Sequence, residues 1–173
     1  RPPVQPTDDA IADMQQAGIE LLASEGFQRY EISAYAKQDK RSRHNLNYWE
    51  FGDYLGIGAG AHGKISLPQQ QQIIRSNKTR QPDNYLVRDP LTLAQQKPIA
   101  LDELAVEFMM NGLRLRDGLS ADYFTSRTGL PALSIAKQVA KLQSQGLLEV
   151  NERRYQTTPL GYQFLNSTLQ GFS

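Results

Sequence analysis

From residue 101 onward, apolar residues recur at the spacing of one face of an α-helix. The pattern holds from residue 101 to residue 115, and Gly118 follows as the expected end of the helix. Methionine on such a face is an ordinary core residue, because its flexible side chain fills gaps between other apolar groups. The positions of this face are Leu101, Leu104, Ala105, Phe108, Met109, Gly112 and Leu115.

Two more helices are predicted downstream of this one. Ser120 is placed to cap a short helix that runs through Phe124, and Gly129 is placed to end it. Pro131 at a first-turn position begins the next helix, and Gly146 ends it. The residues expected to face inward from that helix are Leu133, Ala136, Val139, Ala140 and Leu142.

The last segment predicts two strands and a closing helix. The strands are residues 147–150 and 154–157, around the turn Asn151-Glu152-Arg153. Thr158-Pro159 caps the helix, whose apolar residues are Leu160, Phe164, Leu165 and Leu169. Three helices, a two-stranded wing and a closing helix together predict a winged-helix-like module.

The N-terminal region predicts a helix followed by a strand. Thr7 is the expected N-cap before Asp8 and Asp9, whose charges suit the positive end of a helix, and Gly26 is the expected stop. Phe27–Ser33 is aromatic and β-branched, which favours a buried strand. Helix then strand is the order of one repeat of an α/β barrel. The apolar positions of the helix are Ile11, Met14, Gly18, Leu21 and Leu22.

A hairpin and a connecting segment lie between these two regions. Lys64–Leu67 and Ile73–Ser76 have the composition of strands, and Pro68 and four glutamines join them. Pro82–Pro98 carries three prolines, which break it into short connecting pieces. We therefore expect two domains, residues 1–82 and residues 83–173, in an α+β chain.

Composition indicates a soluble globular chain. The chain has 173 residues, of which 39% are apolar, and a formal net charge of +1. So small a charge gives no electrostatic reason to expect a nucleic acid or an anionic lipid as partner. No apolar run approaches the ~20 residues of a membrane span, and no signal-peptide pattern opens the chain, so a cytoplasmic location is expected.

Candidate chemistry is concentrated in Tyr30–Gly63, which contains both histidines and the only tryptophan. His44 lies between basic residues and an aromatic cluster, where its ring can ligate a metal, move a proton, or hydrogen-bond as a structural residue. The run Gly56–Gly63 carries four glycines after a short apolar segment. It is either a tight turn beside the core or a place where a ligand approaches the backbone. No phosphate-binding helix is signalled after it, so it is not a dinucleotide fingerprint.

Four segments resemble one known family. They are Tyr30–Ser33 (Tyr-Glu-Ile-Ser), His44–Trp49 (His-Asn-x-x-Tyr-Trp), Phe51–Gly58, and Phe108–Leu115 (Phe-Met-Met-Asn-Gly-Leu-Arg-Leu). Together they resemble the C-terminal half of the haem-chaperone branch of the oxygen-independent coproporphyrinogen III oxidase family. The members of that family are radical S-adenosylmethionine (SAM) proteins, and the resemblance covers essentially the whole chain.

The resemblance implies the terminal portion of an incomplete TIM-like radical SAM barrel followed by the winged-helix-like helical domain. In the family, the segment equivalent to Gly58, Ala59, Gly60, Ala61 and His62 lines the S-adenosylmethionine pocket at the C-terminal end of the barrel. The His-Asn-x-x-Tyr-Trp motif implies a haem- or substrate-binding element, with His44 as the candidate haem iron ligand. Its residues here are His44, Asn45, Leu46, Asn47, Tyr48 and Trp49.

The chain departs from the family pattern beside this motif. Many relatives carry a cysteine where this chain has Ser42 and Arg43, so haem ligation by that cysteine is not available here. The preceding loop is basic, and it is either a solvated surface or a rim for the propionates of a porphyrin. Its basic residues are Lys37, Lys40, Arg41 and Arg43.

The resemblance also implies cofactors that this chain cannot hold alone. The family binds a 4Fe–4S cluster through a CxxxCxxC motif, and this chain has no cysteine. The first residues, Arg1-Pro2-Pro3, lack a methionine, so we expect the sequence to begin within a longer protein. The intact parent is expected to bind the cluster, S-adenosylmethionine and haem. It would act in haem trafficking or as a coproporphyrinogen III oxidase, and this chain alone is expected to be inactive.

Two partner hypotheses complete the predictions. A winged-helix nucleic-acid-binding module is the alternative function, but acidic and basic residues balance at seven each from residue 101 on. Self-association is expected as well. Without the missing half of the barrel, the strand at Phe27–Ser33 or the hairpin at Lys64–Ser76 would present an edge to a second copy.

Overall fold

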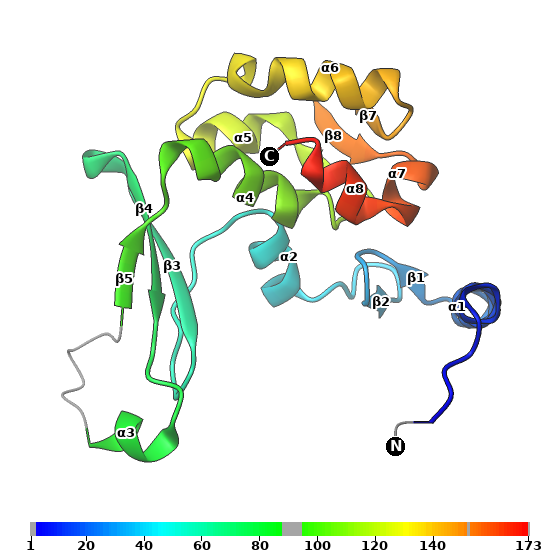
Figure 1. The fold of residues 1–173 in the computed structure, drawn as a ribbon, viewed down its shortest axis with the longest axis horizontal. Coiled ribbons are helices and arrows are strands. Elements are labelled where there is room, and N and C mark those ends of the chain that lie inside the picture. Colours follow the sequence, from blue (N-terminus) through cyan, green and yellow to red (C-terminus); the bar gives the residue numbers. More distant parts are fainter. Residues whose placement is uncertain (1–2, 88–94, 152, 173) are drawn as a thin grey trace.

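The computed structural model describes residues 3–87, 95–151 and 153–172, and it is an α+β fold (Figure 1). In the first part of the chain the elements are α1 (Asp8–Ser24), β1 (Gln28–Arg29), β2 (Tyr35–Ala36), α2 (Arg43–Trp49), β3 (His62–Leu67), the 3-10 turn η1 (Pro68–Gln70), β4 (Gln72–Asn77), α3 (Pro82–Leu86) and β5 (Gln95–Pro98). In the second part they are α4 (Leu101–Gly112), β6 (Leu119–Ser120), α5 (Ala121–Thr128), η2 (Ala132–Ile135), α6 (Ala136–Ser144), β7 (Leu148–Asn151), β8 (Arg154–Thr157), α7 (Pro159–Gln163) and α8 (Leu165–Gln170).

The predicted limits of α1 are confirmed, but its apolar face is not covered. The Thr7 hydroxyl accepts a hydrogen bond from the Ala10 N–H, and Gly26 ends the helix with a φ of 81°. The side chains of Ile11, Met14 and Leu21 are 46%, 67% and 66% exposed. Helical spacing therefore identified the helix without identifying a surface that buries it.

The predicted buried strand at Phe27–Ser33 is wrong. Only Gln28–Arg29 is strand, and it pairs antiparallel with Tyr35–Ala36 rather than with a parallel barrel neighbour. The reason is local, because the Arg29 guanidinium donates to the carbonyl oxygens of Glu31 and Ile32 and closes the chain into a tight loop. No closed barrel is present in the described parts of the chain.

The predicted hairpin is confirmed and extended by a third strand. β3 and β4 pair antiparallel, with Lys64 opposite Arg75, and η1 forms the tip. β5 then pairs with the other side of β4, which the sequence did not predict. Of the predicted connecting segment, residues 88–94, with Pro90, lie outside the described residues. The domain boundary and the self-association stay predictions, although β5 now occupies one of the expected free edges.

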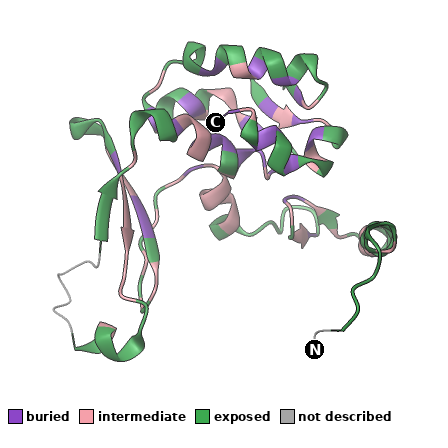
Figure 2. Cartoon of the chain, viewed as in Figure 1, coloured by how far each residue is buried: buried purple, intermediate pink, exposed green. Residues whose placement is uncertain are grey.

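The elements from α4 to α8, which we call the C-terminal module, contain most of the buried side chains (Figure 2). Helices α4, α5 and α6 pack over a three-stranded sheet in the order β6-β8-β7. The strand at Arg154–Thr157 is confirmed, whereas β6 was missed and Glu152 lies outside the described residues. Phe108 and Phe124 meet edge to face at 5.2 Å between ring centroids in the middle of this core.

Several predicted details of this module are wrong. α4 ends at Gly112 rather than near Gly118, and the turns that follow it bury Leu113 and Leu115. The closing helix divides at Phe164 into α7 and α8. Apolar spacing also predicted too many buried residues, because the face that each of these helices turns to the core is narrower than the run of apolar positions suggests. Residues expected inside but exposed are Leu101, Leu133, Ala136, Ala140, Leu160 and Phe164.

The two parts of the chain share one core. Phe51, which follows α2, is 2% exposed and packs edge to face on Phe108 of α4. Leu46 and Trp49 of α2 pack against the same cluster. Within the described residues, no helix is long and apolar enough to cross a membrane.

Replacing Gly161 with alanine is expected to lower the free energy of unfolding by about 2 kcal/mol or more. A Cβ at this position of α7 would overlap the carbonyl group of Leu147, which belongs to the backbone and cannot rotate away. Urea denaturation followed by circular dichroism measures the change.

The matched control is Gly18→Ala in α1, where no atom lies within 4 Å of the added Cβ. This variant is expected to be stabilised by roughly 0.5–1 kcal/mol, because alanine has the higher helix propensity. Equal effects of the two substitutions would contradict the predicted overlap.

Candidate functional site

Helix α2 presents the N-terminal half of the His-Asn-x-x-Tyr-Trp segment to solvent. The Ser42 hydroxyl caps the helix by accepting from the Asn45 N–H at 3.3 Å. His44 lies in the first turn and is exposed, whereas the Asn45 side-chain amide donates to the Tyr30 hydroxyl at 3.1 Å. The cap and the Asn45 bond thus hold the turn that carries His44.

Three aromatic rings in contact lead from α2 toward the hairpin. They belong to His44, Tyr48 and Tyr54, and we call them the aromatic ladder. The rings of His44 and Tyr48 meet edge to face at 4.8 Å, and those of Tyr48 and Tyr54 are 4.0 Å apart. Loss of hydration, reinforced by the neighbouring Tyr54, raises the pKa of Tyr48 above its usual value. The ladder places three ring systems in contact, at interplanar angles of 65° and 35°, with the imidazole at its exposed end.

The C-terminal half of α2 faces the core. Asn47 donates to the Asp53 carbonyl oxygen at 2.9 Å, and the Arg114 guanidinium lies 5.1 Å from the centre of the Trp49 ring. The Trp49 indole N–H is buried and has no hydrogen-bond partner in the described part of the chain. The six motif residues therefore divide into an exposed set around His44 and a structural set around Trp49.

A buried ion pair fixes the chain between α2 and the hairpin. Lys64 is 2% exposed and donates to the Asp53 carboxylate at 2.9 Å, and the same carboxylate accepts from the N–H and hydroxyl of Ser66. Burial alone would raise the pKa of Asp53, but these hydrogen bonds outweigh it and hold that pKa below the usual value. Burial lowers the pKa of Lys64, and Asp53 only partly opposes this.

The glycine-rich segment is a turn in which three backbone donors are paired. Gly58 N–H donates to the Tyr85 hydroxyl of α3, Gly60 N–H to the Thr79 carbonyl oxygen, and Ala61 N–H to the Gly58 carbonyl oxygen. These three N–H groups are therefore not free to bind a phosphate, as a site of the nest type would require. Gly58 has a φ of 101° and no atom within 4 Å of an added Cβ, so its open side is available to a ligand.

Contacts of the aromatic ladder link the two predicted sites, which are the motif His44–Trp49 and the glycine-rich segment Gly58–His62. The turn that precedes β3 lies near α3, whereas α2 contacts α4 (Figure 1). Tyr48 of the first site touches Tyr54, whose backbone bridges to Lys64 next to His62 and Gly63. His62 is exposed at the start of β3.

Sequence reasoning missed several residues that shape these sites. The turn or the helix is supported by Tyr85, Arg114 and Arg127, whose contacts cross long stretches of sequence, and by Asp53, whose partner Lys64 lies eleven residues away. The burial of Lys64, which makes Asp53 its partner, is visible only in the structure.

The basic loop before α2 is solvent-exposed, as predicted. Lys37, Lys40 and Arg43 are exposed, and Arg41 forms an ion pair with Asp117 at 2.6 Å. No cluster of three or more histidine, aspartate or glutamate side chains that could hold a metal ion is found in residues 3–87, 95–151 and 153–172.

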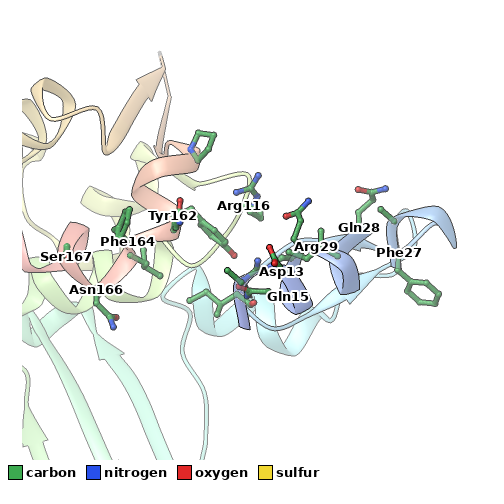
Figure 3. Close-up of a pocket in the computed structure, with 18 residues that line it drawn as sticks. Asp13, Gln15, Phe27, Gln28, Arg29, Arg116, Tyr162, Phe164, Asn166 and Ser167 are labelled. Carbon is green, nitrogen blue, oxygen red and sulfur yellow. Dashed lines mark hydrogen bonds between the residues drawn. The ribbon is translucent and has the colours of Figure 1, made fainter. Parts of the chain in front are cut away.

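Two grooves are also present in the described part of the chain, one outside the predicted sites and one that reaches Asn47. The larger, of about 950 Å³, runs between α1 and the α7–α8 corner (Figure 3). At its centre the Tyr162 ring has the guanidinium groups of Arg29 and Arg116 at 5.0 and 4.7 Å. The second groove, of about 780 Å³, lies between the hairpin tip and the end of α5, and Asn47 and Asp53 are among the residues that line it.

Comparison with known proteins gives one family match. Residues 99–164 match the HemN C-terminal domain. The haem chaperone HemW of Escherichia coli (strain K12) is 42% identical over 172 residues, which cover 99% of this chain and 45% of that protein. HemW of Haemophilus influenzae is 40% identical over 99% of this chain and 44% of that protein.

More distant relatives extend the same group. The mitochondrial radical S-adenosyl methionine domain-containing protein 1 of Bos taurus is 31% identical over 95% of this chain. Among solved structures, the radical SAM enzyme coproporphyrinogen III oxidase (HemN) of E. coli has a TM-score of 0.66 at 19% identity, over 96% of this chain and 42% of that one. At that identity the match shows the fold alone. The chain spans less than half the length of the curated relatives it matches.

Replacing Asp53 with asparagine is expected to lower the free energy of unfolding by about 2 kcal/mol at pH 7, because buried Lys64 loses its counter-charge. The value is below that of a fully buried pair, since the Asp53 side chain is 40% exposed. The folded-state pKa of Asp53 is depressed, so its contribution is present above the usual aspartate pKa of about 3.9 and is lost as pH falls further. The difference in free energy of unfolding between the wild type and Asp53→Asn should therefore disappear below about pH 4.

Urea denaturation at pH 7 and pH 3 measures this gap. Asp117→Asn is the control, because its ion pair with Arg41 is exposed and is worth at most about 0.5–1 kcal/mol. A gap that stays constant with pH would show that the carboxylate charge is not what stabilises this region.

Proposed function

We propose that this chain is the C-terminal part of a radical SAM protein that binds and delivers haem, because it is similar to HemW haem chaperones over almost its whole length and matches the HemN C-terminal domain. The observation that carries the proposal is the aromatic ladder with exposed His44 at its end, inside the motif shared with the family. An exposed imidazole suits the iron of a porphyrin, and the neighbouring aromatic side chains suit its apolar ring system.

The surroundings of α2 support haem as the cargo. Three of the four basic residues lie just before the helix and Arg43 is its first residue, and guanidinium and ammonium groups pair with carboxylates such as propionates. His44, Asn45 and Tyr48 would form the contact surface, while Leu46, Asn47 and Trp49 hold the helix on the core. In this proposal His44 is the axial iron ligand.

The glycine turn fits the part of a S-adenosylmethionine pocket that the family resemblance implies. Gly58 leaves an open side, Gly56 packs directly against the His62 carbonyl group, and Leu55 and Ile57 are 77% and 88% exposed. A thioether cofactor with an adenine ring needs apolar contact more than a phosphate nest, and this turn offers the former. Gly58, Ala59, Gly60, Ala61 and His62 would line that side of the pocket.

A 4Fe–4S cluster does not fit this chain. Cluster iron requires thiolate ligands, and the sequence contains no cysteine. The cluster and the chemistry it supports would therefore belong to another part of the parent protein. Oxidation of coproporphyrinogen III is the second candidate activity of that parent, because the fold matches an enzyme that performs it.

The C-terminal module is proposed to be winged-helix-like and structural. Its helix and strand order agrees with that architecture, but α6 offers only Lys137 and Lys141 to a nucleic acid. Phosphate contacts supply most of the affinity of such modules for DNA. Residues 83–173 are therefore proposed to pack on the barrel rather than to bind nucleic acid.

Hemin added to the purified chain is expected to give a Soret band that His44→Ala abolishes, because the axial ligand is lost. His62→Ala is the control, since the other histidine of the chain lies at the start of β3. Absorbance titration measures both. Equal loss from both variants, or from neither, would return His44 to a structural role.

Anaerobic reconstitution with iron and sulfide is expected to leave the absorbance near roughly 410 nm unchanged, because no thiolate is present to bind a cluster. Iron and sulfide analysis of the desalted protein is the second readout. A stoichiometric cluster would show that other ligands suffice.

A further inference from the structure

The C-terminal end of α2 is held by side chains from the C-terminal module. Arg127, in the last turn of α5, donates a hydrogen bond to the carbonyl oxygen of Glu50, the C-cap residue of α2. Its guanidinium also lies 4.0 Å from the Glu50 carboxylate. The carbonyl end of a helix carries partial negative charge, so a cation at this position stabilises α2 in place. Trp49, the residue before Glu50, is contacted by a second arginine, because the Arg114 guanidinium lies over its ring.

Both arginines are oriented within their own module. The Arg127 guanidinium lies 4.0 Å from the centre of the Tyr123 ring, one turn earlier in α5. The Arg114 Nε donates to the Met110 carbonyl oxygen at 3.1 Å. A side chain whose rotamer is already fixed loses little entropy when it makes its contact. The module therefore presents two preformed cationic contacts to α2.

Helix α2 depends on such contacts because it is short. It has seven residues, none of them fully buried, and helices of that length are not stable alone in water. Its N-terminal end is held by the Ser42 cap and by the bond from Asn45 to Tyr30. The direction of the helix is then set by what holds its other end.

We propose that Arg127 and Arg114 are positioning residues through which the C-terminal module orients α2, and with it His44 and Tyr48, for ligand binding. The proposal rests on the proposed function in one respect, namely that α2 binds haem. Neither arginine belongs to the His-Asn-x-x-Tyr-Trp motif, and each lies more than sixty residues from it in sequence. The module would thus control a site to which it contributes no ligand.

The first test needs no haem, because Trp49 is the only tryptophan of the chain and reports on the end of α2. Arg127→Ala is expected to shift the Trp49 emission to longer wavelength and to speed amide exchange in residues 46–50. Arg127→Lys keeps a cationic donor and should restore most of both signals. Arg153→Ala, an exposed arginine of the same module, is the matched control and should change neither.

The second test is hemin titration of the same variants. Arg127→Ala is expected to bind hemin about tenfold more weakly and with a shifted Soret maximum, as for the loss of a residue that orients a metal ligand. Arg127→Lys should recover most of the affinity. Arg114→Ala provides a second variant should Arg127→Ala fail to fold, and the same direction of change is expected.

The outcomes separate the two proposals. If the wild-type chain gives no Soret band, haem binding is wrong, and the emission and exchange data alone decide whether the arginines hold α2. If the wild type binds hemin and Arg127→Ala and Arg114→Ala both match it in affinity, Soret position, emission and exchange, the positioning role is overturned.

Discussion

The insertion of Phe51 into the C-terminal core is the interaction on which the two parts of the chain depend. Phe51 adopts a φ of 61°, which costs a residue with a Cβ roughly 1–2 kcal/mol. Its ring is 2% exposed and packs on Phe108, and burial of a phenylalanine side chain contributes about 1.5–3 kcal/mol, enough to offset that cost. The reversed backbone ends α2 and turns the chain toward the hairpin.

The contacts around Phe51 also fix the positions of both candidate sites. The Lys64 ammonium lies 4.2 Å from the ring centre and pairs with Asp53, so the hairpin is fixed to the same point. Gly52 follows directly, and an added Cβ there would overlap the Asn47 side chain, which bonds to Asp53. The motif helix on one side and the glycine turn on the other are thereby placed relative to one rigid element.

The two halves of the chain differ in how far they are covered. The C-terminal module surrounds its own core, whereas α1, Leu55 and Ile57 present apolar side chains to solvent. The same difference explains why periodicity predicted burial better after residue 101 than before it.

What the sequence by itself determined was local. Thr7, Thr158 and Gly129 determined helix ends through caps and a left-handed φ, because these signals act over a few residues. The strand-like composition of residues 64–67 and 73–76, on either side of Pro68 and four glutamines, likewise predicted the hairpin. The motif around His44 was also legible, since its residue types are adjacent in sequence. The tertiary structure alone decided which of those residues face solvent, because Arg127, Arg114 and Phe108 act on α2 across more than fifty residues. The loop at Phe27–Ser33 was missed for a local reason instead, because the Arg29 guanidinium donates to the carbonyl oxygens of Glu31 and Ile32, and hydrophobic periodicity records no such contact.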